Sequence, residues 1–203
     1  MRDLLRQKLH KVPLEASLEP TTGDHALTPE LIDVLPEDRI LRPAAVLVPI
    51  VERPRGETIL LTLRTDHLND HAGQVSFPGG RVDEGDTGPE HTALREAEEE
   101  VGLSPDFVDI IGALDIYETR TGFSITPVVG LVRPGFDLVL DEFEVADAFE
   151  VPVAFFLDPA NHTMDSQFWK GAMRHYYDMA YEGYRIWGAT AAMLVNLSKK
   201  LNG

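Results

Sequence analysis

One acidic helix with well-marked ends constrains this chain more than any other segment. Pro89 suits the first turn of a helix, and Thr87 followed by Glu90 fits a capping box. Gly102 suits the left-handed residue that ends a helix. The stretch REAEEEVGL, which starts at Arg95, therefore places four glutamates in the last two turns before that glycine.

The acidic end of this helix is electrostatically unfavourable by itself. A helix C-terminus carries partial negative charge, and like charges four residues apart repel, which together cost on the order of 1–2 kcal/mol. Glu96, Glu99 and Glu100 share one face, whereas Glu98 points away from them. A solvated face on an acidic protein explains these residues without any function. A hard cation such as Mg²⁺ explains them as oxygen ligands of the kind often shared with a substrate diphosphate.

Other positions on the same helix suit packing and support. Ala93, Ala97 and Val101 are spaced by four and can lie on a sheet. Arg95 lies four residues before Glu99, so we expect an ion pair that holds this glutamate.

Apolar and alternating segments before and after the helix predict strands. They are AAVLVPIV from Ala44, TILLTLRT from Thr58, GQVSFPGG from Gly73, FVDIIGALDIYET from Phe107, FSITPVVGLV from Phe123, and a strand pair in MRHYYDMAYEGYRIWG from Met173. The segment 145–157 is expected to be a short helical or irregular stretch interrupted at Pro152, and residues 189–201 a closing helix. This order predicts an α/β fold in which helices flank a mixed sheet.

Residues 1–43 are predicted to form an N-terminal helical and extended arm packed on a domain of residues 44–203. A first helix would bring Leu4, Leu5 and Leu9 to the domain, although its basic, amphipathic start also fits a weak transit peptide. TPELIDVL, with Thr28 as N-cap, predicts a second short helix. The longest apolar run is far too short to span a bilayer.

Composition excludes several classes of function. The 203 residues include no cysteine, which excludes disulfides, thiolate zinc sites and cysteine nucleophiles and is compatible with the cytoplasm, where we expect the protein. The formal net charge of −16 argues against nucleic acid or an anionic membrane as a partner. An anionic small molecule remains compatible if metal ions screen its charge.

Residues 79–103, GGRVDEGDTGPEHTALREAEEEVGL, resemble the Nudix box, G-x5-E-x7-R-E-U-x-E-E-x-G-U, in which U is aliphatic. The matching residues are Gly80, Arg95, Glu96, Glu99, Glu100, Gly102 and Leu103. The loop before Arg95 is one residue longer than the pattern, Asp86 replaces the early glutamate or that glutamate is lost, and Ala97 is small for a U position. The longer loop is typical of the coenzyme A pyrophosphatase branch.

Residues 60–80, LLTLRTDHLNDHAGQVSFPGG, resemble an additional signature of that branch, approximately LLTxRs…G…FPGG. The shared residues are Leu60, Leu61, Thr62, Arg64, Gly73, Phe77, Pro78, Gly79 and Gly80. Asn69 stands where a basic residue is expected. The resemblance covers the chain from Ala44 to Leu194.

The resemblance implies a Nudix-type α/β/α sandwich, a requirement for Mg²⁺ or Mn²⁺, and hydrolysis of a diphosphate by attack of water at phosphorus. The substrate of this branch is coenzyme A or its thioesters, and the products are 3′,5′-ADP and 4′-phosphopantetheine, acylated when the substrate is a thioester. The alternatives are a Nudix hydrolase of another nucleoside diphosphate derivative, such as ADP-ribose or NADH, and a non-catalytic Nudix-fold binding domain. Relatives in the family often form homodimers.

The resemblance also implies roles for individual residues. Glu96, Glu99 and Glu100 are the expected metal ligands, and the general base is either a box glutamate such as Glu99 or an acid of the loop DEFEVADAFE, of which we favour Glu144. The candidate substrate-binding residues are Arg64, His71, Gly79, Gly80 and Arg81, because cations offset phosphate charge and glycine lets the backbone approach a ligand. The aromatic residues Tyr117, Phe123 and Trp187 are expected to lie in the core.

Overall fold

The computed structural model describes residues 1–16, 19–28, 40–68, 71–169 and 172–203. The helix predicted from Thr28 onward falls on residues 29–39 and so lies outside the described residues, as does Asn69. Among the described residues, no helix is long and apolar enough to cross a membrane.

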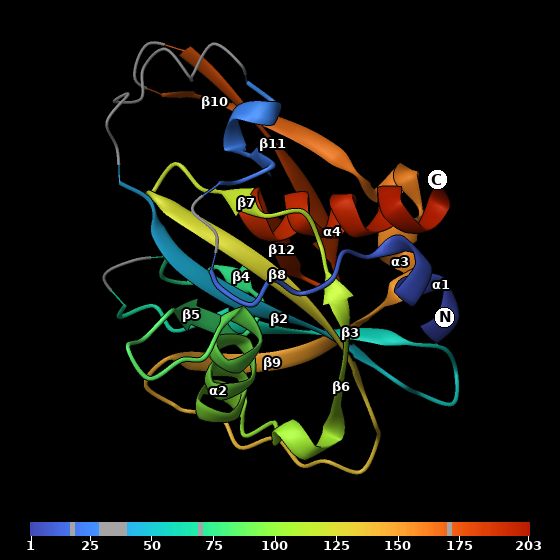
Figure 1. The fold of residues 1–203 in the computed structure, drawn as a ribbon. Helices are drawn as coiled ribbons and strands as arrows, with labels where there is room; N and C mark the ends of the chain where they lie inside the picture. Colours follow the sequence, from blue (N-terminus) through green and yellow to red (C-terminus); the bar gives the residue numbers. More distant parts are fainter. Residues whose placement is uncertain (17–18, 29–39, 69–70, 170–171) are drawn as a thin grey trace.

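Within the described residues, nine strands form a mixed central sheet and three more form a small antiparallel sheet (Figure 1). The strands of the central sheet are β1 (Thr22–Gly23), β2 (Arg42–Val51), β3 (Thr58–Arg64), β4 (Val75–Ser76), β5 (Gly79–Arg81), β6 (Val108–Ala113), β7 (Tyr117–Glu118), β8 (Phe123–Val132) and β9 (Val145–Pro152). The small sheet contains β10 (Thr163–Trp169), β11 (Ala172–Tyr181) and β12 (Tyr184–Trp187). The helices are α1 (Arg2–Lys8), α2 (Pro89–Val101), α3 (Val153–Leu157) and α4 (Gly188–Asn202), with 3-10 turns at Asp24–Ala26, Pro105–Phe107 and Pro159–Asn161.

β2 is the strand that organises the central sheet. It runs parallel to β8 along its whole length, from Arg42 opposite Phe123 to Val51 opposite Val132, and it pairs antiparallel with β3 and β5. β3 continues the sheet to β9, and β8 continues it to β6 and β7. Parallel and antiparallel pairs therefore meet in one sheet, as the order of sequence segments predicted.

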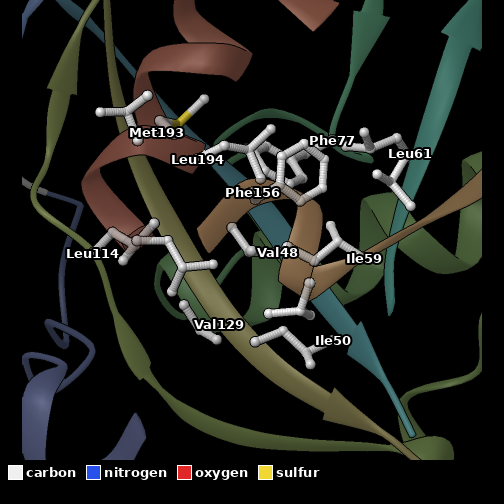
Figure 2. Packing of buried hydrophobic residues seen from close by; sticks show 14 of the residues in the cluster. Val48, Ile50, Ile59, Leu61, Phe77, Leu114, Val129, Phe156, Met193 and Leu194 are labelled. Carbon is white, nitrogen blue, oxygen red and sulfur yellow. The ribbon is translucent and has the colours of Figure 1, made fainter. Parts of the chain in front are cut away.

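Alternate residues of β2 enter two separate cores. Leu47 lies against the α2 side, where Ala93, Ala97 and Val101 are fully buried. Val48 lies in the opposite core, which includes residues of α3 and α4 (Figure 2). Because both faces of the sheet are covered by helices, its strands are apolar on both sides and read as continuous hydrophobic runs. The predicted α/β/α sandwich is confirmed.

The N-terminal segment packs on this sandwich. Leu5 is fully buried and Leu9 packs against the same core, whereas Leu4 is 39% exposed, so its predicted burial is wrong. Leu5 and Leu9 lie four apart on one face of the turn, and Leu4 is rotated away from it. The division between an arm and a domain at residue 43 remains a prediction.

Two predicted elements differ in the structure. The segment 145–157 is a strand followed by a helix. β9 pairs with β3, and the strand ends at Pro152, where α3 begins. Residues 107–119 form two strands, β6 and β7, and not one. In both cases tertiary pairing, which local sequence does not encode, decided the element.

The start of α2 also differs from the prediction. The N-cap is Gly88 and not Thr87, and no side chain caps the helix. The carbonyl oxygen of Leu14 lies so close that a Cβ at Gly88 would be 2.4 Å from it. Glycine therefore lets the N-terminal segment cross the helix start, and the capping box does not form. At the other end Gly102 adopts the predicted left-handed conformation, with φ 70°.

Candidate active site

The glycine pair of β5 brings the sheet against the acidic face of α2. Gly79 and Gly80 pair with Val46 and Ala45 of β2, and the backbone N–H of Gly79 donates a hydrogen bond to Glu100 Oε2 at 3.3 Å. A Cβ at Gly80 would lie 2.4 Å from Glu96 Oε1. Gly80 is therefore required by the close approach of Glu96 to the strand, and Gly79 by the close approach of β2, because a Cβ there would lie 2.5 Å from the backbone oxygen of Ala45.

Glu96 and Glu100 are carboxylates in an unfavourable environment. The side chain of Glu100 is only 5% exposed, and its burial raises its pKa to about 8, with further contributions from Glu96 and Glu144. Burial also raises the pKa of Glu96, and neighbouring Glu99 and Glu144 act in the same direction. A cation that lies between two carboxylates favours the ionised form of both.

Arg64, at the end of β3, lies beside this pair. Its guanidinium is 3.6 Å from Glu100 Oε1 and 3.8 Å from Glu144 Oε2. Arg64 and Glu144 were predicted from segments 80 residues apart in the chain, and the structure brings both to the same carboxylate cluster. The positive charge of the Arg64 guanidinium favours the ionised form of these carboxylates.

The loop that carries Glu144 is fixed from two directions. The Thr65 hydroxyl donates to the Phe143 carbonyl at 2.8 Å, and the Thr65 N–H donates to the Glu144 carbonyl at 3.0 Å. The Asp141 N–H donates to the carbonyl of Glu100 at 2.9 Å. Glu144 is therefore held relative to both β3 and the C-terminal turn of α2. The role of Thr65 could not be predicted from the sequence, because the contact depends on a distant loop.

Arg95 forms ion pairs with the glutamates of this helix face and hydrogen bonds with a buried aspartate. Its guanidinium pairs with Glu99, as predicted, and with Glu96, each at 2.9 Å. It also forms two parallel hydrogen bonds of 3.0 Å to Asp86, whose side chain is only 1% exposed. This guanidinium and the hydrogen bonds from the Asp83 N–H and the Thr92 hydroxyl hold the pKa of Asp86 well below its usual range.

The other predicted residues lie outside this cluster. The side chain of Glu99 is 60% exposed and turned to Arg95. Arg81 is exposed and follows Gly80 in β5, so its side chain lies on the opposite face of the sheet from Glu96, with its guanidinium carbon 5.4 Å from the centre of the Phe123 ring. His71 is exposed, with φ 59°, and its Nδ1 contacts Gln74 Oε1 at 3.0 Å. The structure thus gathers Glu96, Glu100, Glu144 and Arg64 most closely.

The fit of a divalent cation depends on the oxygen donors. Among the described residues, no three His, Asp or Glu side chains are arranged as a ready set of ligands. Glu96 and Glu100 nevertheless offer carboxylate oxygens, which hard divalent cations prefer, and a cation would offset the burial that raises their pKa values. The donor set therefore fits a hard cation that keeps part of its water shell.

Comparison with known proteins agrees with this arrangement. A family model described as NUDIX domain matches residues 41–167. Proteins named Uncharacterized Nudix hydrolase NudL, from Escherichia coli strain K12 and from Escherichia fergusonii, are 42% identical over 160 residues, which are 79% of this chain and 83% of each relative.

Two solved structures are similar to this chain at lower sequence identity. A Nudix hydrolase from M. smegmatis, RenU, has a TM-score of 0.48 at 19% identity and covers 59% of this chain and 82% of its own. A MutT protein from Methanosarcina mazei Go1 has a TM-score of 0.48 at 21% identity, with 60% and 84% covered. On the family model and the sequence relatives, the chain belongs to the Nudix hydrolase family.

Proposed function

We propose that this Nudix hydrolase cleaves the diphosphate bond of coenzyme A or an acyl-coenzyme A. The products are 3′,5′-ADP and 4′-phosphopantetheine, which keeps the acyl group when the substrate is a thioester. The observation that carries the proposal is the position of Arg64, because it belongs to the segment that resembles the coenzyme A signature and lies 3.6 Å from Glu100. The signature residues Gly79 and Gly80 support the same cluster.

Nudix hydrolases generally use divalent metal ions, and Mg²⁺ or Mn²⁺ is the proposed cofactor here. Glu96 and Glu100 would hold the ion, and Glu99 would join them by turning from Arg95. The ion supplies charge that polarises phosphoryl oxygens and acidifies water.

The protein side chains supply positioning and proton transfer. Arg64 binds a phosphoryl oxygen of the diphosphate, since its planar guanidinium matches phosphate geometry. Glu144 takes the proton of the attacking water, with Glu99 as the alternative base. The side chain of Glu144 is 42% exposed, so water reaches it, while Thr65 fixes its loop. His71 and Arg81 are the remaining proposed contacts to the substrate.

A substrate panel tests the proposal directly. The purified protein is incubated with coenzyme A, ADP-ribose and NADH, each with and without Mg²⁺ or Mn²⁺, and the products are separated by mass. Metal-dependent release of 3′,5′-ADP from coenzyme A is the expected result. Cleavage of ADP-ribose or NADH alone would contradict the proposed substrate, and no cleavage of any of the three would favour the non-catalytic binding domain. A homodimer and a cytoplasmic location remain predictions.

Gly80→Ala is expected to lower the hydrolysis rate roughly tenfold or more while the fold is kept. The three atoms nearest to the added methyl would all belong to the carboxylate of Glu96, the flexible end of a side chain, which the methyl would displace. Gly79→Ala is the matched comparison, because its methyl would lie 2.5 Å from the backbone oxygen of Ala45 and would disturb the β5–β2 pair. Urea unfolding and kcat of both variants check this, and an equal loss of stability in the two would contradict it.

A further inference from the structure

Two arginines contact the carboxylates of the candidate site, and they are held in different ways. Arg95 forms two parallel hydrogen bonds of 3.0 Å to the buried carboxylate of Asp86. Arg64 Nη1 lies 3.6 Å from Glu100 Oε1, and its Nη2 lies 3.8 Å from Glu144 Oε2. Charge-assisted hydrogen bonds are shorter, about 2.7–2.9 Å. Among the described residues, no hydrogen bond restrains the Arg64 guanidinium, so charge alone holds it beside the carboxylates.

The Arg64 guanidinium stands between two carboxylates from different elements. Glu100 belongs to α2 and is only 5% exposed, whereas Glu144 directly precedes β9 and is 42% exposed. The side chain of Arg64 is 21% exposed, so most of it is enclosed in the cluster. Burial makes ionisation of Glu100 costly, and the charge of Arg64 opposes this effect. Arg64 therefore supplies positive charge at the carboxylate that is also the firmest candidate for a metal ligand.

Arg64 and a divalent ion compete for this carboxylate. A hard divalent ion takes carboxylate oxygens as ligands, and the guanidinium of Arg64 lies close to one oxygen of Glu100. Two positive charges at such a short distance repel strongly where little water screens them. A guanidinium without hydrogen bonds has little to lose by moving away. Phosphoryl oxygens are suitable new partners, because they match its planar set of N–H donors.

We propose that Arg64 is a displaceable counter-ion, which balances Glu100 until a metal ion binds there and then turns to a phosphoryl oxygen of the substrate. This inference rests on the proposed function and deepens it, because it couples the binding of metal to the binding of the diphosphate. Metal then binds more weakly than the carboxylates alone would allow, and phosphate binds weakly until Glu100 has another partner. By linkage, each ligand strengthens the binding of the other.

Titration of Mn²⁺ alone tests the first half of the proposal. Calorimetry gives the dissociation constant of Mn²⁺ for the wild type, Arg64→Gln and Arg64→Lys. Arg64→Gln should bind Mn²⁺ roughly tenfold more tightly because the competing charge is gone, a change within the usual range of coupling between two sites. Arg64→Lys keeps the charge and should stay near the wild type. Arg55→Gln, which removes an exposed arginine from the turn after β2, is the matched control and should also stay there. Unchanged or weaker binding in Arg64→Gln would overturn the proposal.

Titration of inorganic pyrophosphate into the metal-free protein tests the second half. Glu100→Gln removes the carboxylate that Arg64 faces, so this variant should bind pyrophosphate roughly tenfold more tightly than the wild type, the effect of one charge-assisted hydrogen bond. The double variant Glu100→Gln/Arg64→Gln should lose this gain. Glu98→Gln removes the same charge from the exposed opposite face of α2 and should bind as the wild type does. No gain in Glu100→Gln, or a gain that the double variant keeps, would show that Arg64 is not released to phosphate.

Neither titration requires turnover, so failure of this inference can be told from failure of the proposed function. If coenzyme A is not cleaved but both titrations give the expected shifts, the counter-ion role of Arg64 is supported and the proposed substrate is not. If coenzyme A is cleaved while Arg64→Gln binds Mn²⁺ no more tightly than the wild type, the proposed function stands and the counter-ion role is refuted.

Discussion

Glu100→Gln is expected to lower metal-dependent hydrolysis roughly a thousandfold and, in the absence of metal, to make the protein more stable at pH 8. The loss of rate follows because a proposed metal ligand is removed, and metal ions contribute several kcal/mol of charge stabilisation in the transition state. The gain in stability follows because the side chain of Glu100 is 5% exposed and its carboxylate is costly to ionise there.

The dependence on pH has a defined sign. Burial raises the pKa of Glu100 to about 8 from its usual value of 4.5, so between these two pH values the folded state binds more protons than the unfolded state. The free energy of unfolding of the metal-free wild type therefore falls as pH rises through this window, by on the order of a few kcal/mol. Glu100→Gln lacks this decrease. Addition of Mg²⁺ or Mn²⁺ at pH 8 should restore stability in the wild type and have a much smaller effect in the variant.

Two further variants separate the metal site from general effects of charge. Glu98→Gln removes the same charge from the exposed opposite face of α2 and should change neither the rate nor the stabilisation by metal. Glu144→Gln should lower the rate and alter the pH–rate profile while stabilisation by metal is kept, because Glu144 is proposed as a base. Thermal unfolding with and without metal tests the stabilisation by metal. Measurement of kcat over a range of pH tests the proposed base. A nearly normal rate in Glu100→Gln would refute its assignment as a ligand.

Local sequence was enough to predict the parts of the fold that one segment determines. The helix carrying Ala93, Ala97 and Val101 was predicted with its buried face, and Gly102 ends it as expected. The segments from Ala44 and Phe123 were predicted as strands because they are continuous apolar runs. The structure pairs them and buries both of their faces. The strand β9 was missed because its pairing with β3 depends on residues about 90 positions earlier in the chain.

The same limit applies to the candidate site. Glu96 and Glu100 were found by helical spacing, and Arg64 and Glu144 by resemblance, and the structure brings these four together. The contact of Arg42 with Phe123 was not predicted, since only the parallel β2–β8 register brings the two side chains together. Phe123 is only half-buried there, so the prediction that it lies in the core is wrong. Helical periodicity describes one element at a time and cannot report which strand ends lie side by side.

Asp86→Asn is expected to destabilise the protein by about 3 kcal/mol at neutral pH, as removal of one partner from a buried ion pair usually does. Among the described residues, Asp86 is the most deeply buried carboxylate that Arg95 contacts, and it also accepts hydrogen bonds from the Asp83 N–H and the Thr92 hydroxyl. An amide would keep the shape but would lose the charge that opposes the guanidinium. Arg95 would then hold Glu96 and Glu99 less firmly, so the hydrolysis rate should fall as well.

Asp83→Asn is the matched control for this buried pair. The side chain of Asp83 is 73% exposed and lies 3.8 Å from Arg95, so its replacement should change stability by less than about 1 kcal/mol. The folded state lowers the pKa of Asp86, so the stability that it contributes is present above the unfolded value of 3.8 and is lost as pH falls through the folded value. The difference between the wild type and Asp86→Asn should therefore shrink in acid, in contrast to the Glu100 effect, which grows towards pH 8. Urea unfolding of both variants from pH 7 to pH 3 checks this. Equal destabilisation by the two substitutions would show that the buried carboxylate of Asp86 does not stabilise the longer loop before Arg95.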